Sequence, residues 1–251
     1  MSEKHSPLDQ FKIEPILPAQ LGGYDISFSY SSLFMFIAIA SITLFITLGM
    51  RKRAMVPGRW QSLAEISYEF VAGMLKENVG AEGRKFFPFI FSLFMFILFC
   101  NLLGMLPWAF TVTSHIAVTF ALALLVFFTV IIVGVVKHGL HFLHLFIPSG
   151  IPGWMVPIIF PIEIVSFLAR PISLSLRLAV SMMAGHVLLK VMAGFVIGLG
   201  TATIALGGVG GLLPLVFISL LIALEVFVAF LQAFIFALLT TIYLNDAINL
   251  H

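Results

Sequence analysis

Charged residues are scarce in this chain of 251 residues. Lys, Arg, Asp and Glu together make up 10% of it, whereas hydrophobic residues make up 61%. A water-soluble fold needs more polar surface than this to cover its core. The composition therefore excludes an ordinary soluble domain and predicts an all-α polytopic membrane protein surrounded by the lipid bilayer. The formal net charge of +2 is too small to indicate nucleic acid as a partner.

Cysteine is nearly absent as well. Cys100 is the only one, so an intrachain disulfide is excluded. The sequence also lacks H-E-x-x-H and the phosphate-binding pattern G-x-x-x-x-G-K-[ST]. His138, His141 and His144 have a spacing that could bind a metal, but no carboxylate lies near them in sequence, and an interfacial cluster is the simpler interpretation. We therefore predict no catalytic residue, no metal and no cofactor.

Apolar runs divide the first half of this single membrane domain, 1–251, into segments of different kinds. After an external N-terminal segment, 1–27, the run 28–50 predicts one transmembrane helix, and the basic residues after it place its end in the cytoplasm. Segment 58–79 has apolar residues at helical spacing among charges, which predicts an amphipathic helix on the membrane surface. A transmembrane hairpin is expected at 86–136.

The last third of the chain contains apolar runs that are too long for upright helices. Residues 212–250 include only two charged residues. As one helix they would extend roughly 58 Å, about twice the hydrocarbon thickness. The run that begins at residue 157 is similarly long. We expect a steeply tilted helical hairpin over 157–250, joined by a turn that contains the glycines between 198 and 211.

Arg177 lies where an ordinary membrane helix carries no charge. It is surrounded by apolar residues in Leu174–Val180, and its guanidinium stays protonated in proteins. Placing such a cation in hydrocarbon costs at least about 2.5 kcal/mol. One alternative is an arginine whose side chain extends to the membrane interface. An intramembrane arginine otherwise predicts a functional site with an acidic partner.

A hairpin that turns near residue 205 predicts three polar layers, each with one residue from either helix. The layers are His186 with Glu225, Arg177 with Gln232, and Glu163 with Asp246. Histidine and a buried carboxyl group can exchange protons near neutral pH, whereas arginine releases none. The layers therefore predict a proton path with Arg177 as a fixed barrier. At about 100° per residue, His186 and Arg177 point to opposite sides of a straight helix. The contact of His186 with Glu225 and that of Arg177 with Gln232 therefore cannot be equally close.

Small residues follow Glu225 at four-residue intervals. They are Ala229, Ala233 and Ala237, and together they form a ridge that another helix can approach closely. The ridge suits either a helix of another polypeptide or packing within this chain. Because the carboxylates of the layers lie too far along the helices from Arg177, we expect its acidic partner on another chain.

The residues around Arg177 resemble a known family. The segments 172–186 (ISLSLRLAVSMMAGH) and 231–240 (LQAFIFALLT) are similar to the signature of subunit a of F-type ATP synthase, and 101–107 (NLLGMLP) is a weaker match. The resemblance covers nearly the whole chain. It implies a non-catalytic stator subunit of the membrane sector, CF(0), which supplies two proton half-channels to a rotating ring of c subunits.

The resemblance also implies roles for individual residues. Arg177 matches the arginine that interacts with the ring carboxylate and blocks a direct proton leak. The residues expected to take part in proton translocation are Arg177, Glu163, His186, Glu225, Gln232, Ser181 and Asn101. The order of histidine before glutamate resembles mitochondrial and alphaproteobacterial members. Ser181 replaces a frequent asparagine, and Gly104 stands where some bacterial members have an aspartate.

The partners implied are the c-subunit ring, b-type subunits of the peripheral stalk, and the other F-type ATP synthase subunits. A bacterial inner membrane location is expected ahead of the mitochondrial inner membrane, with an external N-terminus and a cytoplasmic C-terminus. A stand-alone secondary cation/proton transporter is the alternative, although its expected paired halves with broken helices are not evident. A membrane-embedded hydrolase lacks a nucleophile or a metal set.

Overall fold

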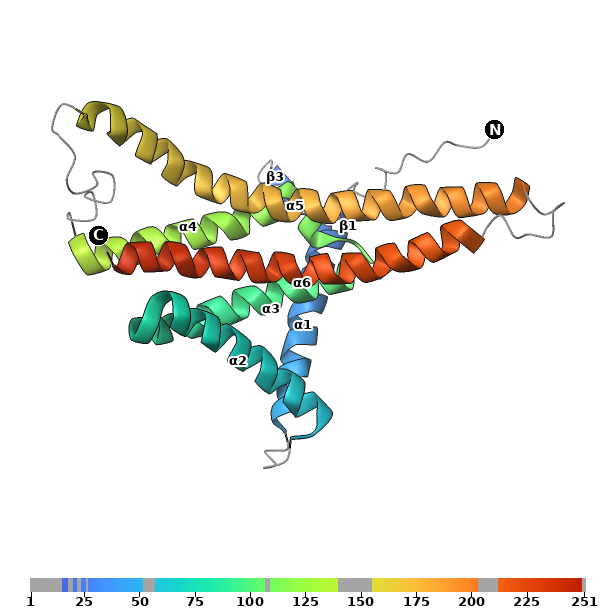
Figure 1. Cartoon of the computed structure of the whole chain (residues 1–251), viewed down its shortest axis with the longest axis horizontal. Coiled ribbons are helices and arrows are strands. Elements are labelled where there is room, and N and C mark those ends of the chain that lie inside the picture. Colours follow the sequence, from blue (N-terminus) through green and yellow to red (C-terminus); the bar gives the residue numbers. More distant parts are fainter. Residues whose placement is uncertain are drawn as a thin grey trace.

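The computed structural model describes residues 15–17, 20–21, 24–25, 27–51, 57–106, 109–139, 155–202 and 212–249. Within these residues the chain is mainly helical, as the sequence predicts (Figure 1). The helices are α1 (Tyr30–Met50), α2 (Arg59–Val79), η2 (Gly80–Phe86), α3 (Phe87–Gly104), η3 (Val112–Ser114), α4 (Ile116–His138), α5 (Val156–Ala202) and α6 (Leu212–Ile248). Among the described residues, five helical runs are long and apolar enough to cross a membrane, with α2, η2 and α3 counted as one run.

Short strands precede α1, which the all-α prediction did not include. β1 (Pro15–Leu17) pairs antiparallel with β4 (Phe28–Ser29), and β2 (Gln20–Leu21) pairs antiparallel with β3 (Tyr24–Asp25). At the end of β4, the side-chain oxygen of Ser29 accepts a 3.5 Å hydrogen bond from the backbone N–H of Ser32. This bond satisfies one of the free donors at the start of α1.

Glycine ends two of the helices. Gly80 follows α2 with a φ of 76° and donates its N–H to the carbonyl of Lys76. Gly139 follows α4 with a φ of 58° and donates to the carbonyl of Val135. A positive φ favours glycine, and both bonds satisfy carbonyls at a helix end. These residues therefore explain where α2 and α4 stop.

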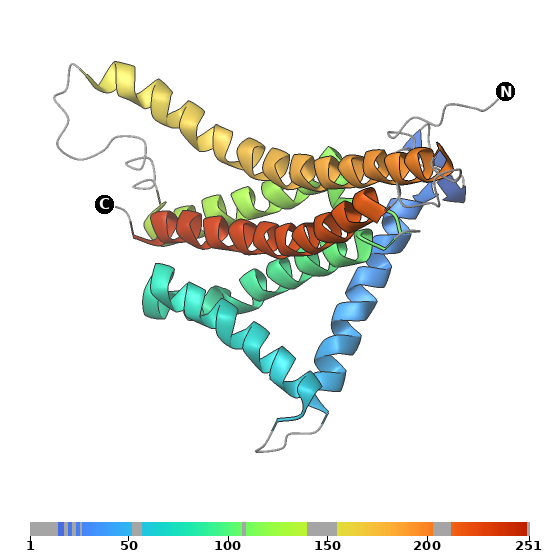
Figure 2. The same cartoon turned by 45° about the vertical axis from the view of Figure 1, so that its right-hand side comes forward.

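The helices α5 and α6 form the long hairpin, and they lie side by side over much of their length (Figures 1 and 2). They have 47 and 37 residues, or roughly 70 and 55 Å. α1 has 21 residues, roughly 31 Å, which matches the hydrocarbon thickness. α1 crosses the direction of α5 and α6 steeply in both views. An upright α1 therefore requires strongly tilted α5 and α6.

The first part of α5 diverges from α6 (Figures 1 and 2). Pro161 and Pro171 lie inside the helix, and each removes one N–H from the helical hydrogen-bond ladder, which bends a helix. The other end of α5 continues further than expected, to Ala202, and includes Gly198 and Gly200. The remaining glycines of the predicted turn lie outside the described residues.

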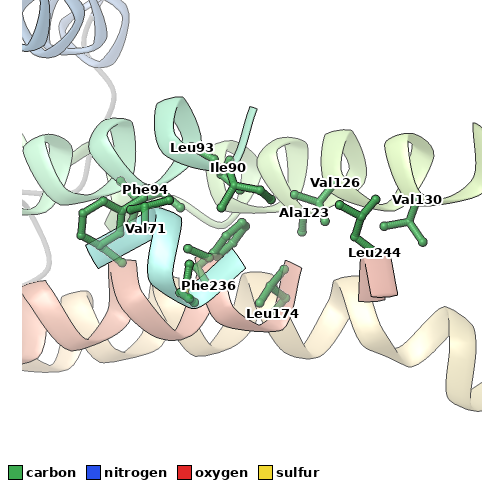
Figure 3. Packing of buried hydrophobic residues seen from close by; sticks show 14 of the residues in the cluster. Val71, Ile90, Leu93, Phe94, Ala123, Val126, Val130, Leu174, Phe236 and Leu244 are labelled. Carbon is green, nitrogen blue, oxygen red and sulfur yellow. The ribbon is translucent and has the colours of Figure 1, made fainter. Parts of the chain in front are cut away.

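The core forms where α2, α3 and α4 pack against α5 and α6 (Figure 3). Phe70 of α2 is central to one part of it, with ring centroids 5.8, 5.7 and 5.4 Å from those of Phe94, Phe230 and Phe234. Aromatic pairs at such distances add to the stability that burial provides. The second half of α2 is thereby anchored to α3 and α6.

The alanine ridge of α6 is filled from within the chain. Ala229, Ala233 and Ala237 are fully buried, and Asn101 of α3 donates its Nδ2–H to the carbonyl of Ala229 at 3.1 Å. Of the two interpretations of the ridge, packing within the chain is therefore confirmed. The other interpretation, that a helix of another polypeptide packs on this ridge, is wrong.

Candidate functional site

The structure brings His186 of α5 and Glu225 of α6 together. The distance from His186 Nδ1 to Glu225 Oε1 is 3.4 Å, and the two side chains are only 12% and 5% exposed. Neither oxygen of Glu225 has a hydrogen-bond donor among the described residues. Because an unpaired charge is costly to bury, this pair is stable when Glu225 holds a proton or when an imidazolium faces its carboxylate.

Gly185 provides the space that Glu225 occupies. A Cβ atom at position 185 would lie 2.8 Å from Glu225 Oε1 and 3.3 Å from Glu225 Cδ. Contacts this short force one of the groups to move, so the carboxyl group lies against α5 only because residue 185 has no side chain. Gly185 thus helps to set the distance between Glu225 and the neighbouring His186.

Thr111 joins this pair from the connection between α3 and α4. Its Oγ1 lies 2.9 Å from His186 Nε2 and donates to the carbonyl of Gly104 at 3.2 Å. Segment 109–114 has no basic residue, as expected of an external loop. Nevertheless, Thr111, Thr113 and Ser114 are 8%, 0% and 1% exposed, because η3 packs against α5. The segment is therefore part of the site.

Arg177 is exposed, and it has no acidic partner within the described part of the chain. It precedes His186 by nine residues, which places the two side chains on opposite sides of a helix. His186 contacts α6, and no hydrogen bond joins Arg177 to the half-buried Gln232 among the described residues. The guanidinium is therefore accessible to a group outside the described chain.

The predicted layer of Glu163 and Asp246 is wrong. Asp246 Oδ2 instead forms an ion pair with Arg170 Nη1 at 3.1 Å. The Arg170 guanidinium also lies over the rings of Phe167 and Tyr243, 5.7 and 5.1 Å from their centroids. Glu163 comes seven residues before Arg170, roughly 10.5 Å away along the helix. Arg170, and not Glu163, is therefore the residue of α5 that meets Asp246.

Ser181 and Asn101 do not reach the titratable pair. Ser181 Oγ donates to the carbonyl of Leu178 in its own helix at 3.0 Å. Asn101 is fully buried, and its Oδ1 has no hydrogen-bond partner among the described residues. Its bond to Ala229 joins α3 to α6 one helical turn from Glu225. Asn101 therefore contributes to the position of α6.

Sequence reasoning assigned no role to Thr111 or Arg170. The signal for Thr111 was a group of three hydroxyl side chains in the loop of an otherwise apolar hairpin. The signal for Arg170 was a second arginine in the same apolar run, seven residues before Arg177. Each signal was visible in the sequence, but neither identified the contact that the residue makes.

The histidines near the end of α4 form no metal cluster in the part of the chain that the structure describes. His138 donates from Nε2 to the carbonyl of Ile248 at 3.0 Å and so connects the ends of α4 and α6. His141 and His144 lie outside the described residues. The metal-binding interpretation depends on them and is therefore not tested.

Comparisons with known proteins agree with the resemblance. The family model described as ATP synthase A chain matches residues 32–245. The relative "ATP synthase subunit a" of Paramagnetospirillum magneticum is 53% identical over 249 residues, which cover 98% of this chain and 99% of the relative. The protein of the same name from Rhizobium etli is 56% identical over 245 residues, 98% of each chain. The matched region includes Asn101, Thr111, His186 and Glu225, and the chain belongs to the ATP synthase A chain family.

Proposed function

We propose that this chain is the proton-translocating stator subunit of the F-type ATP synthase membrane sector. The observation that carries the proposal is the arrangement of Arg177 relative to the pair of His186 and Glu225. The pair is buried between α5 and α6, whereas Arg177 is exposed half a turn out of phase on the same helix. One site can exchange protons, and the other presents a permanent charge to a partner.

The pair of His186 and Glu225 belongs to the outer half-channel. An imidazole and a carboxyl group within contact distance can pass a proton between them, and histidine titrates in the physiological range. A proton that arrives from outside is held by this pair before it reaches a carboxylate of the c-subunit ring. The burial of both side chains limits other routes for that proton.

Arg177 separates the two half-channels. Its guanidinium cannot release a proton and therefore cannot relay one. Its fixed charge repels protons and stabilises the ionised form of a ring carboxylate that comes near. The apolar side chains of Ile172, Leu176 and Val180 around it are 49%, 41% and 55% exposed, which suits a partner helix in the membrane. This surface is where we place the c-subunit ring.

Glu163 belongs to the cytoplasmic half-channel. It is half-buried, and it has no ion-pair partner among the described residues. Asp246 is held by Arg170, so of these two carboxylates Glu163 is the one without a cationic partner among the described residues and is available to accept a proton. Because the named relatives are bacterial subunits, we place the chain in a bacterial inner membrane, with b-type stalk subunits as further partners.

Purification in mild detergent tests this proposal. We expect the chain to copurify with a small two-helix proteolipid in stoichiometric excess, and proton flux in liposomes to require that proteolipid. A secondary cation/proton transporter would behave differently, because it needs no ring. Recovery of this chain alone, with full ion-exchange activity in liposomes, would contradict the stator function.

Substitution of Gly185 by alanine is expected to lower proton-driven ATP synthesis about tenfold. The added methyl group would overlap with Glu225 Oε1, and overpacking of this kind costs on the order of 1–3 kcal/mol. Initial rates of ATP synthesis in inverted membrane vesicles measure the effect. Gly194→Ala is the matched control, since no heavy atom lies within 4 Å of a Cβ at that position of α5. Equal activity of the two variants would argue against close contact between Gly185 and Glu225.

A further inference from the structure

Thr111 is in contact with the ring nitrogen of His186 that faces away from Glu225. The imidazole contacts Glu225 Oε1 through Nδ1 at 3.4 Å and Thr111 Oγ1 through Nε2 at 2.9 Å. One nitrogen of a neutral imidazole carries hydrogen and the other does not, and the hydrogen bond at one nitrogen determines the state of the other. The state of Nδ1 therefore depends on Thr111.

The number of hydrogens gives the direction of the bond between Thr111 and His186. The Thr111 hydroxyl has one hydrogen, and it is donated to the carbonyl of Gly104 at 3.2 Å, since a carbonyl can only accept. Gly104 is the last residue of α3, where helical carbonyls no longer find partners within the helix. Toward His186, Oγ1 is then an acceptor, and Nε2 must carry hydrogen.

The position of Thr111 is itself fixed by its neighbours. Its carbonyl accepts hydrogen bonds from Ser114 Oγ at 2.7 Å and from the Ser114 backbone N–H at 3.3 Å. On the other side, a Cβ at position 104 would lie 2.9 Å from Thr111 Cγ2 and 3.2 Å from Thr111 Cα. The absence of a side chain at Gly104 therefore allows Thr111 to approach α3 and hold its hydroxyl between Gly104 and His186.

Few other groups compete for the imidazole. Within the described chain, the charged or titratable groups near His186 are Glu225 of α6 and the exposed Lys190, one turn further along α5. His115, at the start of α4, stacks instead on Phe110 with ring centroids 4.8 Å apart. The connection before η3 thus faces His186 with the hydroxyl group of Thr111.

We propose that Thr111 is a positioning residue for proton translocation: it accepts the Nε2–H of His186 and leaves Nδ1 as the nitrogen that exchanges a proton with Glu225. When the proton leaves Nδ1 it arrives at Glu225 Oε1. An imidazolium and a carboxylate then become a neutral imidazole and a carboxylic acid. This inference rests on the proposed stator function, in which His186 and Glu225 conduct protons.

The test compares Thr111→Val, Thr111→Ser and Thr119→Val in the assembled complex. Valine keeps the shape of threonine but lacks the hydroxyl, whereas serine retains it. Thr119 is the matched control, because it is fully buried and its hydroxyl bonds to carbonyls of its own helical turn, those of His115 and Ile116. Passive proton conduction is measured in membrane vesicles after removal of the catalytic head, with the pH varied on the outer side.

We expect Thr111→Val to lower proton conduction about tenfold, because the imidazolium of His186 loses a hydrogen bond and such a bond to a charged group is worth enough for this effect. Thr111→Ser should retain most of the wild-type conduction. The valine variant should also need a more acidic outer side for half-maximal conduction, because the imidazolium loses an acceptor for its Nε2–H. Thr119→Val should conduct normally. A valine variant with the wild-type rate and pH profile would overturn the inference.

Two further measurements separate the possible failures. Nitrogen-15 spectra of the seven histidines, with the His186 signal assigned by its loss in His186→Ala, should show Nε2 protonated in neutral His186 of the unsubstituted protein. Protonation on Nδ1 instead would refute the inference even if Thr111→Val failed to assemble. Normal conduction by His186→Ala and Glu225→Gln would contradict the stator function itself. If His186→Ala and Glu225→Gln lose proton conduction but Thr111→Val conducts normally, only the role of Thr111 is contradicted.

Discussion

Replacement of Arg177 by alanine is expected to reduce proton-driven ATP synthesis at least about a hundredfold, the scale on which loss of one preorganised charge-stabilising group acts. The guanidinium is exposed and has no acidic partner within the described chain, so its loss leaves no buried carboxylate unpaired. The packing of α5 against α6 should survive. We therefore expect the complex to assemble in normal amounts. ATP synthesis by inverted membrane vesicles and the quantity of the subunit in the membrane measure the two effects.

The barrier function gives this variant a second signature. Without the fixed cation, protons should pass between the half-channels without rotation, so the passive proton leak should rise as synthesis falls. Arg177→Lys should retain part of the activity, because lysine keeps the charge but lacks the planar, forked guanidinium. Arg59→Ala is the control, since Arg59 is exposed on α2, away from the site. Near-normal synthesis by Arg177→Ala would rule out the role assigned to this residue.

Exchange of His186 and Glu225 for each other is expected to be less harmful than removal of either one. His186→Ala and Glu225→Gln should each lower proton conduction about a hundredfold, within the range that positioned proton-transfer groups contribute. The double variant with Glu at 186 and His at 225 keeps one imidazole and one carboxyl group at the same contact. We therefore expect it to recover at least about tenfold over the single variants.

The measurement is proton conduction at several outer pH values in membranes with equal amounts of subunit. The single variants His186→Glu and Glu225→His complete the cycle and serve as controls, since each leaves two like groups at the contact. Contact predicts that the effects of the two substitutions do not add. If the double exchange is as damaging as the worse single substitution, His186 and Glu225 do not act as a pair.

The sequence predicted the contact between His186 and Glu225 because both residues lie in uninterrupted helical runs on either side of one turn. Helical periodicity then determines which residues meet, and it also predicted that the contacts of His186 and Arg177 with α6 could not be equally close. The same reasoning failed for Glu163 and Asp246. It assumed a straight α5, whereas the prolines inside the helix allow its first part to leave α6.

Thr111 could not be predicted by periodicity, because it lies in a non-helical connection before η3. Its contact with His186 depends on how this connection folds back over Gly104 and packs on α5, which is a matter of tertiary structure. The alanine ridge shows a related limit. Small side chains at Ala229, Ala233 and Ala237 indicated a close approach, but the composition of a ridge does not identify which helix approaches it.

The ion pair of Arg170 with Asp246 changes the electric field along α5. Glu163, Arg170 and Arg177 follow one another at seven-residue intervals along α5. Asp246 locally neutralises the middle member of this series. The guanidinium of Arg177, which has no acidic partner among the described residues, is therefore the one arginine of this series whose charge is not neutralised nearby. An anion beside α5 is attracted more strongly at Arg177 than at Arg170, so the ion pair confines the positive charge of the helix to one place.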